Sequence, residues 1–204
     1  MHNELQNIIS GESQVRYGKN IQAVICYLRA SEKSSALDKT NKHFKREETT
    51  RLKTYIENHN LWVKDIDLNN YVSEGAEQKV YLKDSKSVFK LNDAIYYLSW
   101  EDYFVNLLLN NYFFSDTAYN LLGFFENENK VYAVVEQPFV KADEPTNLTF
   151  VEQFLNSNGF QKIRNNDYFN SELGIILEDL HDENVLTSEG ILYFIDTVFY
   201  LKNE

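Results

Sequence analysis

The segment Leu177-Glu-Asp-Leu-His-Asp-Glu-Asn-Val-Leu186 decides how the rest of this chain is interpreted. Within it, Asp179 and Asn184 are five residues apart, and a short strand and a turn follow. The next strand, the apolar run Ile191-Leu-Tyr-Phe-Ile195, delivers Asp196 twelve residues after Asn184. A loop between two strands can present an acid at one end and an amide at the other to one pocket. The sequence therefore predicts that Asp179, Asn184 and Asp196 meet in a single site.

These three side chains suit one kind of chemistry. Phosphoryl transfer needs a carboxylate near the accepting hydroxyl, and hard oxygen ligands for the magnesium ions that neutralise a triphosphate. Asp196 interrupts the apolar run of residues 192–201, where a charge must be paired, bound to metal or placed at a strand end. A carboxylate that only caps a turn explains this feature equally well, so the two interpretations stay open on this evidence.

His181 lies inside the same loop, between Asp179 and Asp182. One interpretation makes it a metal ligand or a proton shuttle. The other makes it a structural histidine that orients the loop, and we favour this second interpretation.

The loop also resembles a known family. Asp179-Leu-His-Asp-Glu-Asn184-Val-Leu, followed by Ile195-Asp196, is similar to the catalytic loop and metal-binding aspartate of the protein-kinase-like superfamily. The style is that of the aminoglycoside phosphotransferases, and the D-x-x-x-x-N spacing matches. The resemblance implies that Asp179 is the catalytic base and that Asn184 and Asp196 are magnesium ligands.

The order of elements upstream agrees with this resemblance. Residues 71–82 resemble the first hairpin of a kinase, which places Gly75 in the loop over the phosphates. Val88-Phe-Lys90 resembles the third strand, with Lys90 reaching the α- and β-phosphates. The cofactors that the resemblance implies are therefore ATP and Mg²⁺.

Two further roles follow from the same resemblance. Glu101, on the helix after the third strand, is the expected ion-pair partner of Lys90, and Asp102 is the alternative. The strand that ends in Val134-Val-Glu-Gln-Pro138 resembles the hinge whose backbone hydrogen-bonds an adenine.

Within the superfamily, the chain resembles the polyvalent protein kinase domain family of bacterial mobile elements. The resemblance covers about residues 20–202. Its recurring blocks are residues 21–29, 107–124, 136–140, 158–160 and 195–197.

Several features depart from a working protein kinase. The phosphate loop has the single glycine Gly75, with Glu74, Glu77 and Gln78 around it. Thr197 follows Asp196 where kinases carry phenylalanine, and only eight residues follow Asp196, too few for an activation segment and a helical lobe. We therefore expect a truncated C-terminal lobe, and we do not expect this chain alone to phosphorylate other proteins.

The hydrophobic pattern predicts an α+β protein with short antiparallel strands and a long helix. The resemblance implies a reduced protein-kinase-like fold, in which an antiparallel N-lobe sheet and this long helix precede the truncated C-lobe. Residues 1–68 are expected to form a helical extension that packs on the body, and residues 69–204 the kinase-like domain, divided into 69–141 and 142–204. The expected helices are 20–30, 44–58, 96–110 and 150–156. The expected strands are 71–72, 79–82, 88–91, 119–126, 130–137, 160–163, 175–177, 185–186 and 192–195.

The composition limits which cellular compartment and which classes of binding partner we expect for this chain. The chain has 204 residues, of which 43% are apolar, and one cysteine. It lacks both a secretory signal and an apolar run of membrane-spanning length, so we expect a cytoplasmic protein without a membrane partner. Residues 1–70 carry a net charge of +2 and residues 71–204 one of −13. The acidic body disfavours nucleic acid as a partner.

Three functional hypotheses remain. The first is an ATP- and Mg²⁺-binding kinase-like module, a phosphotransferase whose acceptor the sequence does not specify. The second is a non-catalytic, pseudokinase-like module that binds a protein partner in a mobile-element system. The third, a minor alternative, is a metal-dependent hydrolase that uses Asp179, His181, Asp182 and Asp196.

Overall fold

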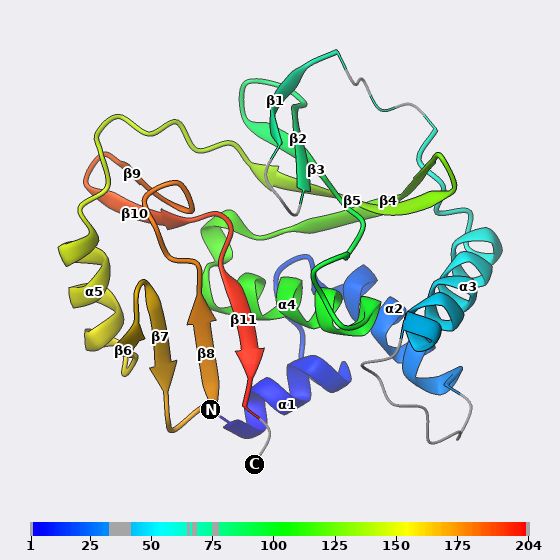
Figure 1. Cartoon of the computed structure of the whole chain (residues 1–204), viewed down its shortest axis with the longest axis horizontal. Coiled ribbons are helices and arrows are strands. Elements are labelled where there is room, and N and C mark those ends of the chain that lie inside the picture. The colour runs from blue at the N-terminus through cyan, green and yellow to red at the C-terminus, as the bar shows by residue number, and fades with distance from the viewer. Residues whose placement is uncertain (1, 33–41, 65, 67–68, 75–77, 203–204) are drawn as a thin grey trace.

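The computed structural model describes residues 2–32, 42–64, 66, 69–74 and 78–202, which form a sheet stacked on helices (Figure 1). The sheet is antiparallel and has the strand order β1-β2-β3-β5-β4. This arrangement confirms the α+β class and is compatible with the predicted kinase-like sheet. Its strands are β1 Tyr71–Glu74, β2 Gln78–Leu82, β3 Ser87–Asn92, β4 Asn120–Asn127 and β5 Lys130–Pro138.

Helix α4, Trp100–Phe113, lies beneath this sheet and forms the centre of the molecule (Figure 1). It begins four residues later than the pattern predicted. Ser99 is in an extended conformation and its hydroxyl accepts a hydrogen bond from the Asp102 N–H at 3.0 Å, which fixes the helix start there. Phe104 and Leu108 of α4 pack into the core beneath the sheet, whereas Leu109 packs into the core of the C-terminal part.

Helices α1, α2 and α3 pack against α4. In α2, the predicted apolar stripe of Ile21, Val24, Ile25 and Leu28 is fully buried. Helix α1 was not predicted, because the segment after it is polar and its apolar residues cover little more than two turns. The helices are α1 His2–Ser10, α2 Gly18–Ala30 and α3 Lys42–Asn58. A boundary between residues 68 and 69 stays a prediction, since residues 67–68 lie outside the described part.

The C-terminal part holds α5, a four-stranded sheet and a hairpin. The sheet has the order β11-β8-β7-β6, and β7 and β11 were not predicted as separate strands. In the β8–β11 pair, Val198 is opposite Glu178. Because Asp179 follows Glu178 and Asp196 precedes Val198 by two residues, this pairing brings both acids to the same end of the sheet. The elements are α5 Leu148–Ser157, β6 Gln161–Arg164, β7 Asp167–Asn170, β8 Ile175–Glu178, β9 Val185–Ser188, β10 Ile191–Phe194 and β11 Val198–Leu201.

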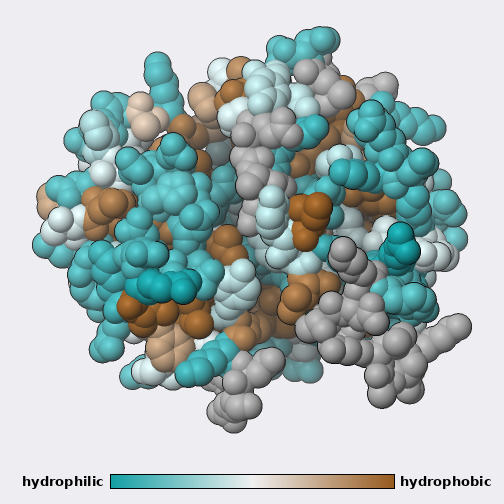
Figure 2. All heavy atoms as spheres, viewed as in Figure 1, coloured by the Kyte–Doolittle hydropathy of each residue, from teal (hydrophilic) through white to brown (hydrophobic). Residues whose placement is uncertain are grey.

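The surface is mixed in character. Figure 2 shows hydrophilic residues over most of one face, with apolar residues in small separate groups. Within the described residues, no helix is both long enough and apolar enough to span a bilayer.

Helix α3 holds the first turn of α4 through a buried carboxylate. Glu48 accepts hydrogen bonds from the Trp100 N–H at 2.6 Å and the Glu101 N–H at 3.1 Å. These N–H groups have no partner inside their own helix, and the helix dipole favours negative charge at this end. Lys45, one turn before Glu48, donates to the Tyr97 carbonyl at 2.7 Å and to the Ala94 carbonyl. The two side chains therefore fix where α4 starts relative to the sheet.

We expect Glu48→Gln to gain stability relative to the wild type as the pH rises from about 4 to 7. Burial raises the pKa of Glu48, so the folded protein holds that proton more tightly than the unfolded chain does. Stability of this kind is present below the unfolded pKa and is lost as the pH rises through the folded pKa. Glutamine resembles the protonated acid and does not titrate. Urea unfolding at several pH values measures the difference.

The control for this experiment is Glu57→Gln, an exposed carboxylate on the same helix. Its stability difference from the wild type should change far less over the same pH range. A Glu48→Gln difference that stays constant, or that favours the wild type as the pH rises, contradicts the prediction.

Candidate active site

The loop after β8 brings Asp179 and Asn184 together, as the sequence predicted. The Asn184 Nδ2 group donates to the Asp179 backbone carbonyl at 2.9 Å and to Asp179 Oδ2 at 2.8 Å. Asp179 has a φ of 67°, in the left-handed region that non-glycine residues rarely adopt. The two hydrogen bonds hold this conformation. They also use the nitrogen of the Asn184 amide, so its oxygen is the atom that can bind a metal ion.

His181 orients this loop, in agreement with the structural interpretation. Its Nδ1 atom accepts a hydrogen bond from the Glu183 N–H at 3.2 Å. In the neutral ring the proton is then on Nε2, which lies 3.2 Å from Asp179 Oδ1. His181 therefore donates to one carboxylate oxygen of Asp179, Oδ1, while Asn184 donates to the other, Oδ2. The carboxylate of Asp179 stays 57% exposed, so a substrate can reach it.

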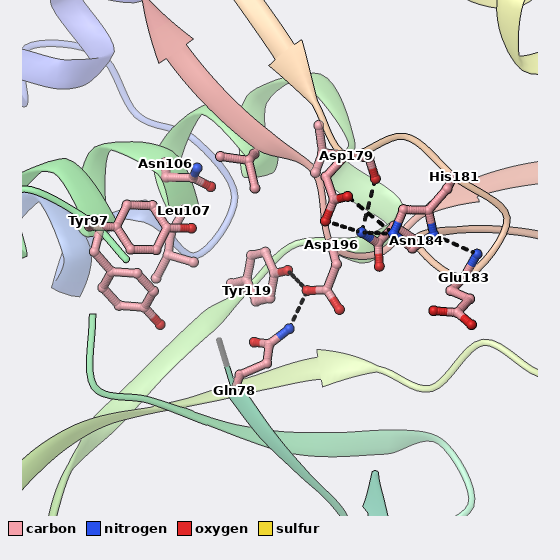
Figure 3. A pocket seen from close by; sticks show the side chains of 13 residues that line it. Gln78, Tyr97, Asn106, Leu107, Tyr119, Asp179, His181, Glu183, Asn184 and Asp196 are labelled. Carbon is pink, nitrogen blue, oxygen red and sulfur yellow. Dashed lines mark hydrogen bonds and ion pairs between the residues drawn. The ribbon is translucent and has the colours of Figure 1, made fainter. Parts of the chain in front are cut away.

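Asp196 is the meeting point of the two lobes. Its Oδ1 atom accepts hydrogen bonds from Lys90 Nζ at 2.8 Å, Gln78 Nε2 at 2.5 Å and the Tyr119 hydroxyl at 3.0 Å. Figure 3 shows Gln78 and Tyr119 converging on it from the sheet side. Lys90 is only 3% exposed, and this ion pair supplies the counter-charge that a buried ammonium needs. Asp196, which interrupts an apolar run in the sequence, is therefore paired in this structure, and its partner is Lys90.

The expected pairing of Lys90 with Glu101 is wrong in this structure. Glu101 Oε1 instead accepts from Arg29 Nε at 3.0 Å. The reason is position: Glu101 is in the first turn of α4, which faces the end of α2, whereas Lys90 reaches across the sheet to Asp196. Asp102, the alternative partner, follows Glu101 in that turn and is not joined to Lys90 either. Gly75 lies outside the described residues.

Tyr119 and Gln137 position the backbone next to Asp196, and sequence reasoning missed both. The carbonyl of Ile195 accepts from the Tyr119 hydroxyl at 2.6 Å and from Gln137 Nε2 at 3.0 Å. Lys90 Nζ donates to the same carbonyl at 3.1 Å. Burial, and then the charge of Asp196, raise the pKa of Tyr119 well above its usual value, so its hydroxyl remains a donor. The one signal in the sequence was the polar residue Gln137 near the end of a largely apolar strand pattern.

Two cavities meet at this cluster. The first, the sheet cavity, has a volume of about 450 Å³ and lies between the sheet and β9; Lys90, Val88 and Leu186 are part of its lining. The second, the α4 cavity, has a volume of about 330 Å³ and is lined by α4, Asp179 and Thr197 among others (Figure 3). The residues common to both linings are Gln78, Glu183, Asn184 and Asp196.

A comparison with known protein families identifies the family to which this chain belongs. The family described as "Serine/Threonine/Tyrosine Kinase found in polyvalent proteins" matches residues 45–203, which is well over half of the chain. The chain belongs to this kinase family. The match begins within α3 and includes Lys45 and Glu48, the two side chains of that helix that hold α4. Neither the curated proteins nor the solved structures contain a match to the chain.

The arrangement of His, Cys, Asp and Glu side chains bears on the metal-dependent hydrolase alternative. Among the described residues, no group of three or more His, Cys, Asp and Glu side chains is placed to hold a metal ion. The hydrolase alternative, which needs such a group from Asp179, His181, Asp182 and Asp196, therefore has no support. A kinase needs fewer protein ligands, because the phosphates and water supply the remaining oxygens around Mg²⁺.

Two buried polar atoms in the lining residues of the α4 cavity are unusual. Asn106 and Thr197 are each 3% exposed. Within the described part of the chain, Asn106 Nδ2 and Thr197 Oγ1 have no hydrogen-bond partner. An unsatisfied buried polar group costs about 1–3 kcal/mol, so two of them next to an active site need an explanation.

Proposed function

We propose that this kinase-family chain binds ATP with Mg²⁺ and transfers the γ-phosphoryl group to a hydroxyl acceptor. One observation carries the proposal. Lys90 and Asp196 are 106 residues apart in the chain, yet their charged atoms lie 2.8 Å apart where the sheet cavity meets Asn184. A cation for phosphates and oxygen ligands for a metal therefore converge at the edge of a cavity large enough for a nucleotide base.

The sheet cavity fits a nucleotide. Val72, Val80 and Val88 line it from the sheet, and Leu186 lines it from β9. These apolar side chains suit the flat faces of an adenine. Pro138, the last residue of the strand that the resemblance assigned as the hinge, borders the same cavity together with Phe139 and Val140. Lys90 belongs to the lining as well, which supports a role for its ammonium in binding the phosphates of a nucleotide in this cavity.

The metal ligands are the Asn184 amide oxygen and the Asp196 carboxylate. Both are hard oxygen donors of the kind that Mg²⁺ prefers, and each lines both cavities. Bound Mg²⁺ would neutralise charge on the phosphates during transfer. Phosphate oxygens would then compete with Asp196 for Lys90, whose ammonium has three donors.

Asp179 is the proposed catalytic base. Its carboxylate takes the proton of the acceptor hydroxyl while that oxygen bonds to the γ-phosphorus. The bond between the γ-phosphorus and the β,γ-bridging oxygen breaks at the same time, and ADP leaves with the electron pair. Hydrogen bonds from Asn184 and His181 hold the carboxylate in one orientation before the acceptor arrives.

The second candidate is a non-catalytic binding module, and one observation favours it. Oδ1 of Asp196 already accepts three protein donors, and Gln78 must leave it before that oxygen can bind a metal ion. In a module of this kind the ion pair would serve only to join the two lobes.

Thermal unfolding with and without ATP plus Mg²⁺ separates these candidates. A ligand at 100 times its dissociation constant stabilises the fold by about 2.7 kcal/mol, which is a shift of a few degrees for a domain of this size. We expect this shift with ATP plus Mg²⁺ and a much smaller one with ATP plus EDTA. No shift at millimolar ATP, in a sample that unfolds cooperatively, rejects the phosphotransferase and favours the binding module.

A further inference from the structure

We infer that the α4 cavity receives the phosphoryl acceptor, and that this acceptor is a small hydroxyl-bearing molecule without negative charge. The inference rests on the proposed function, because it assigns a substrate to the same site. The α4 cavity and the sheet cavity share Asn184 and Asp196, the two proposed metal ligands. Asp179 lines the α4 cavity and not the sheet cavity. The proposed base therefore faces the compartment that the nucleotide does not use.

The size of the α4 cavity indicates a small molecule. Its volume of about 330 Å³ is at the lower end of the range for small-molecule pockets. A volume of this order suits one ring, such as a monosaccharide or another cyclic polyol. A folded protein would need a far larger contact surface to bind specifically.

The negative charge of the residues that line the α4 cavity disfavours an anionic acceptor. Asp179, Glu183 and Asp196 contribute three carboxylates to the cavity. None of its described lining residues is lysine or arginine, and the ammonium of Lys90 is bound to Asp196 from the sheet side. An acceptor that carries a carboxylate or phosphate would meet these carboxylates without a compensating lysine or arginine, since Mg²⁺ bound at Asn184 and Asp196 is already shared with the nucleotide phosphates.

The unsatisfied polar groups in the lining indicate that the acceptor carries hydroxyl groups. Asn106 on α4 and Thr197 beside Asp196 both line the cavity and are almost fully buried. Figure 3 shows the amide end of Asn106 extending from α4 on the side of the loop that carries Asp179. A hydroxyl both donates and accepts, so it satisfies the Asn106 amide in either flipped orientation as well as the Thr197 hydroxyl. The aromatic rings of Tyr97 and Tyr103 supply apolar faces for a ring molecule.

The test uses saturation-transfer NMR and phosphoryl transfer from radiolabelled ATP. The probes are D-glucose, D-ribose and myo-inositol, the anionic D-glucose 6-phosphate and D-gluconate, and casein as a protein acceptor. The variants are Asn106→Leu and Thr197→Val, which keep the side-chain volume and remove the polar group. Exposed Asn156→Leu on α5 is the matched control.

We expect at least one neutral probe to bind at millimolar concentration and to accept phosphate, while both anionic probes fail. Each cavity variant should weaken that binding about tenfold, whereas the Asn156 control and the ATP–Mg²⁺ thermal shift stay unchanged. Without ligand, both cavity variants should unfold at the same temperature as the wild type or a higher one, because apolar groups replace unsatisfied ones.

Three results overturn the inference while ATP–Mg²⁺ binding still supports the proposed function. They are failure of every neutral probe, equal binding of the anions, and labelling of casein alone. Neutral binding that both cavity variants leave intact overturns it as well. If ATP plus Mg²⁺ produces no thermal shift in the wild type, that separate result rejects the proposed function itself.

Discussion

Replacing Asp196 with asparagine is expected to abolish Mg²⁺-dependent ATP binding and to destabilise the protein by about 2–4 kcal/mol. The loss of binding follows if Asp196 is the charged metal ligand that we propose. The destabilisation follows because Lys90, which is 3% exposed, loses the charge that compensates its burial. The range extends down to about 2 kcal/mol because the Asp196 side chain is 25% exposed, and its partial hydration weakens the ion pair. Urea unfolding and the ATP–Mg²⁺ thermal shift measure the two effects separately.

The double variant Lys90→Met with Asp196→Asn separates charge pairing from ligand binding. We expect it to recover much of the lost stability, since replacing both members of a buried pair leaves no unpaired charge. It should not recover ATP binding. Glu152→Gln, which breaks an exposed pair with Lys162, is the control and should change stability by less than about 1 kcal/mol. An Asp196→Asn protein that keeps the full ATP–Mg²⁺ shift contradicts the assignment of the metal site.

The sequence predicted the parts of this molecule that depend on local spacing. Asp179 and Asn184 are close in the chain, so the loop that joins them nearly determines their geometry. Helix α2 was equally clear, because its four apolar residues repeat at helical spacing over a full face. The fold class followed from the alternation of short strand patterns with long helical ones.

Contacts that depend on tertiary distance were not predictable in the same way. The choice of Asp196 over Glu101 as the partner of Lys90 depends on how far α4 lies from β3, and no spacing encodes that distance. Strand β11 was not predicted as a separate strand for a related reason. It continues the apolar run that contains β10, and only its pairing with β8 shows that the chain forms two strands there.

The same limit applies to the donors around Asp196. Gln78 is the first residue of β2 and Tyr119 directly precedes β4, and their atoms meet only because β2 and β4 belong to one sheet. A tyrosine near an aromatic-rich helix reads as core, and Tyr119 is indeed buried. Its hydroxyl nevertheless donates a hydrogen bond to Asp196, so one side chain both belongs to the core and contacts the candidate site. These contacts bring side chains from the sheet to the acid that the loop motif had already identified.

Replacing Asp179 with asparagine is expected to lower the rate of ADP formation by about 10²–10⁴-fold and to leave ATP–Mg²⁺ binding intact. The amide keeps the size of the carboxylate and can still accept a hydrogen bond from Asn184 or His181, so the loop should retain its shape. What it cannot do is take the proton of an acceptor. Because Asp179 is 57% exposed, the change in unfolding free energy should stay within about 1 kcal/mol.

Asp182→Asn is the matched control for this result. It removes an exposed carboxylate three residues further along the same loop, and we expect its rate to stay close to that of the wild type. ADP formation measured with a coupled assay, at saturating ATP, compares the three proteins directly. An equal fall in both variants would point to the charge of the loop rather than to a base. A rate unaffected in Asp179→Asn would remove this residue from the mechanism, and the intact thermal shift would show that the nucleotide site itself had survived.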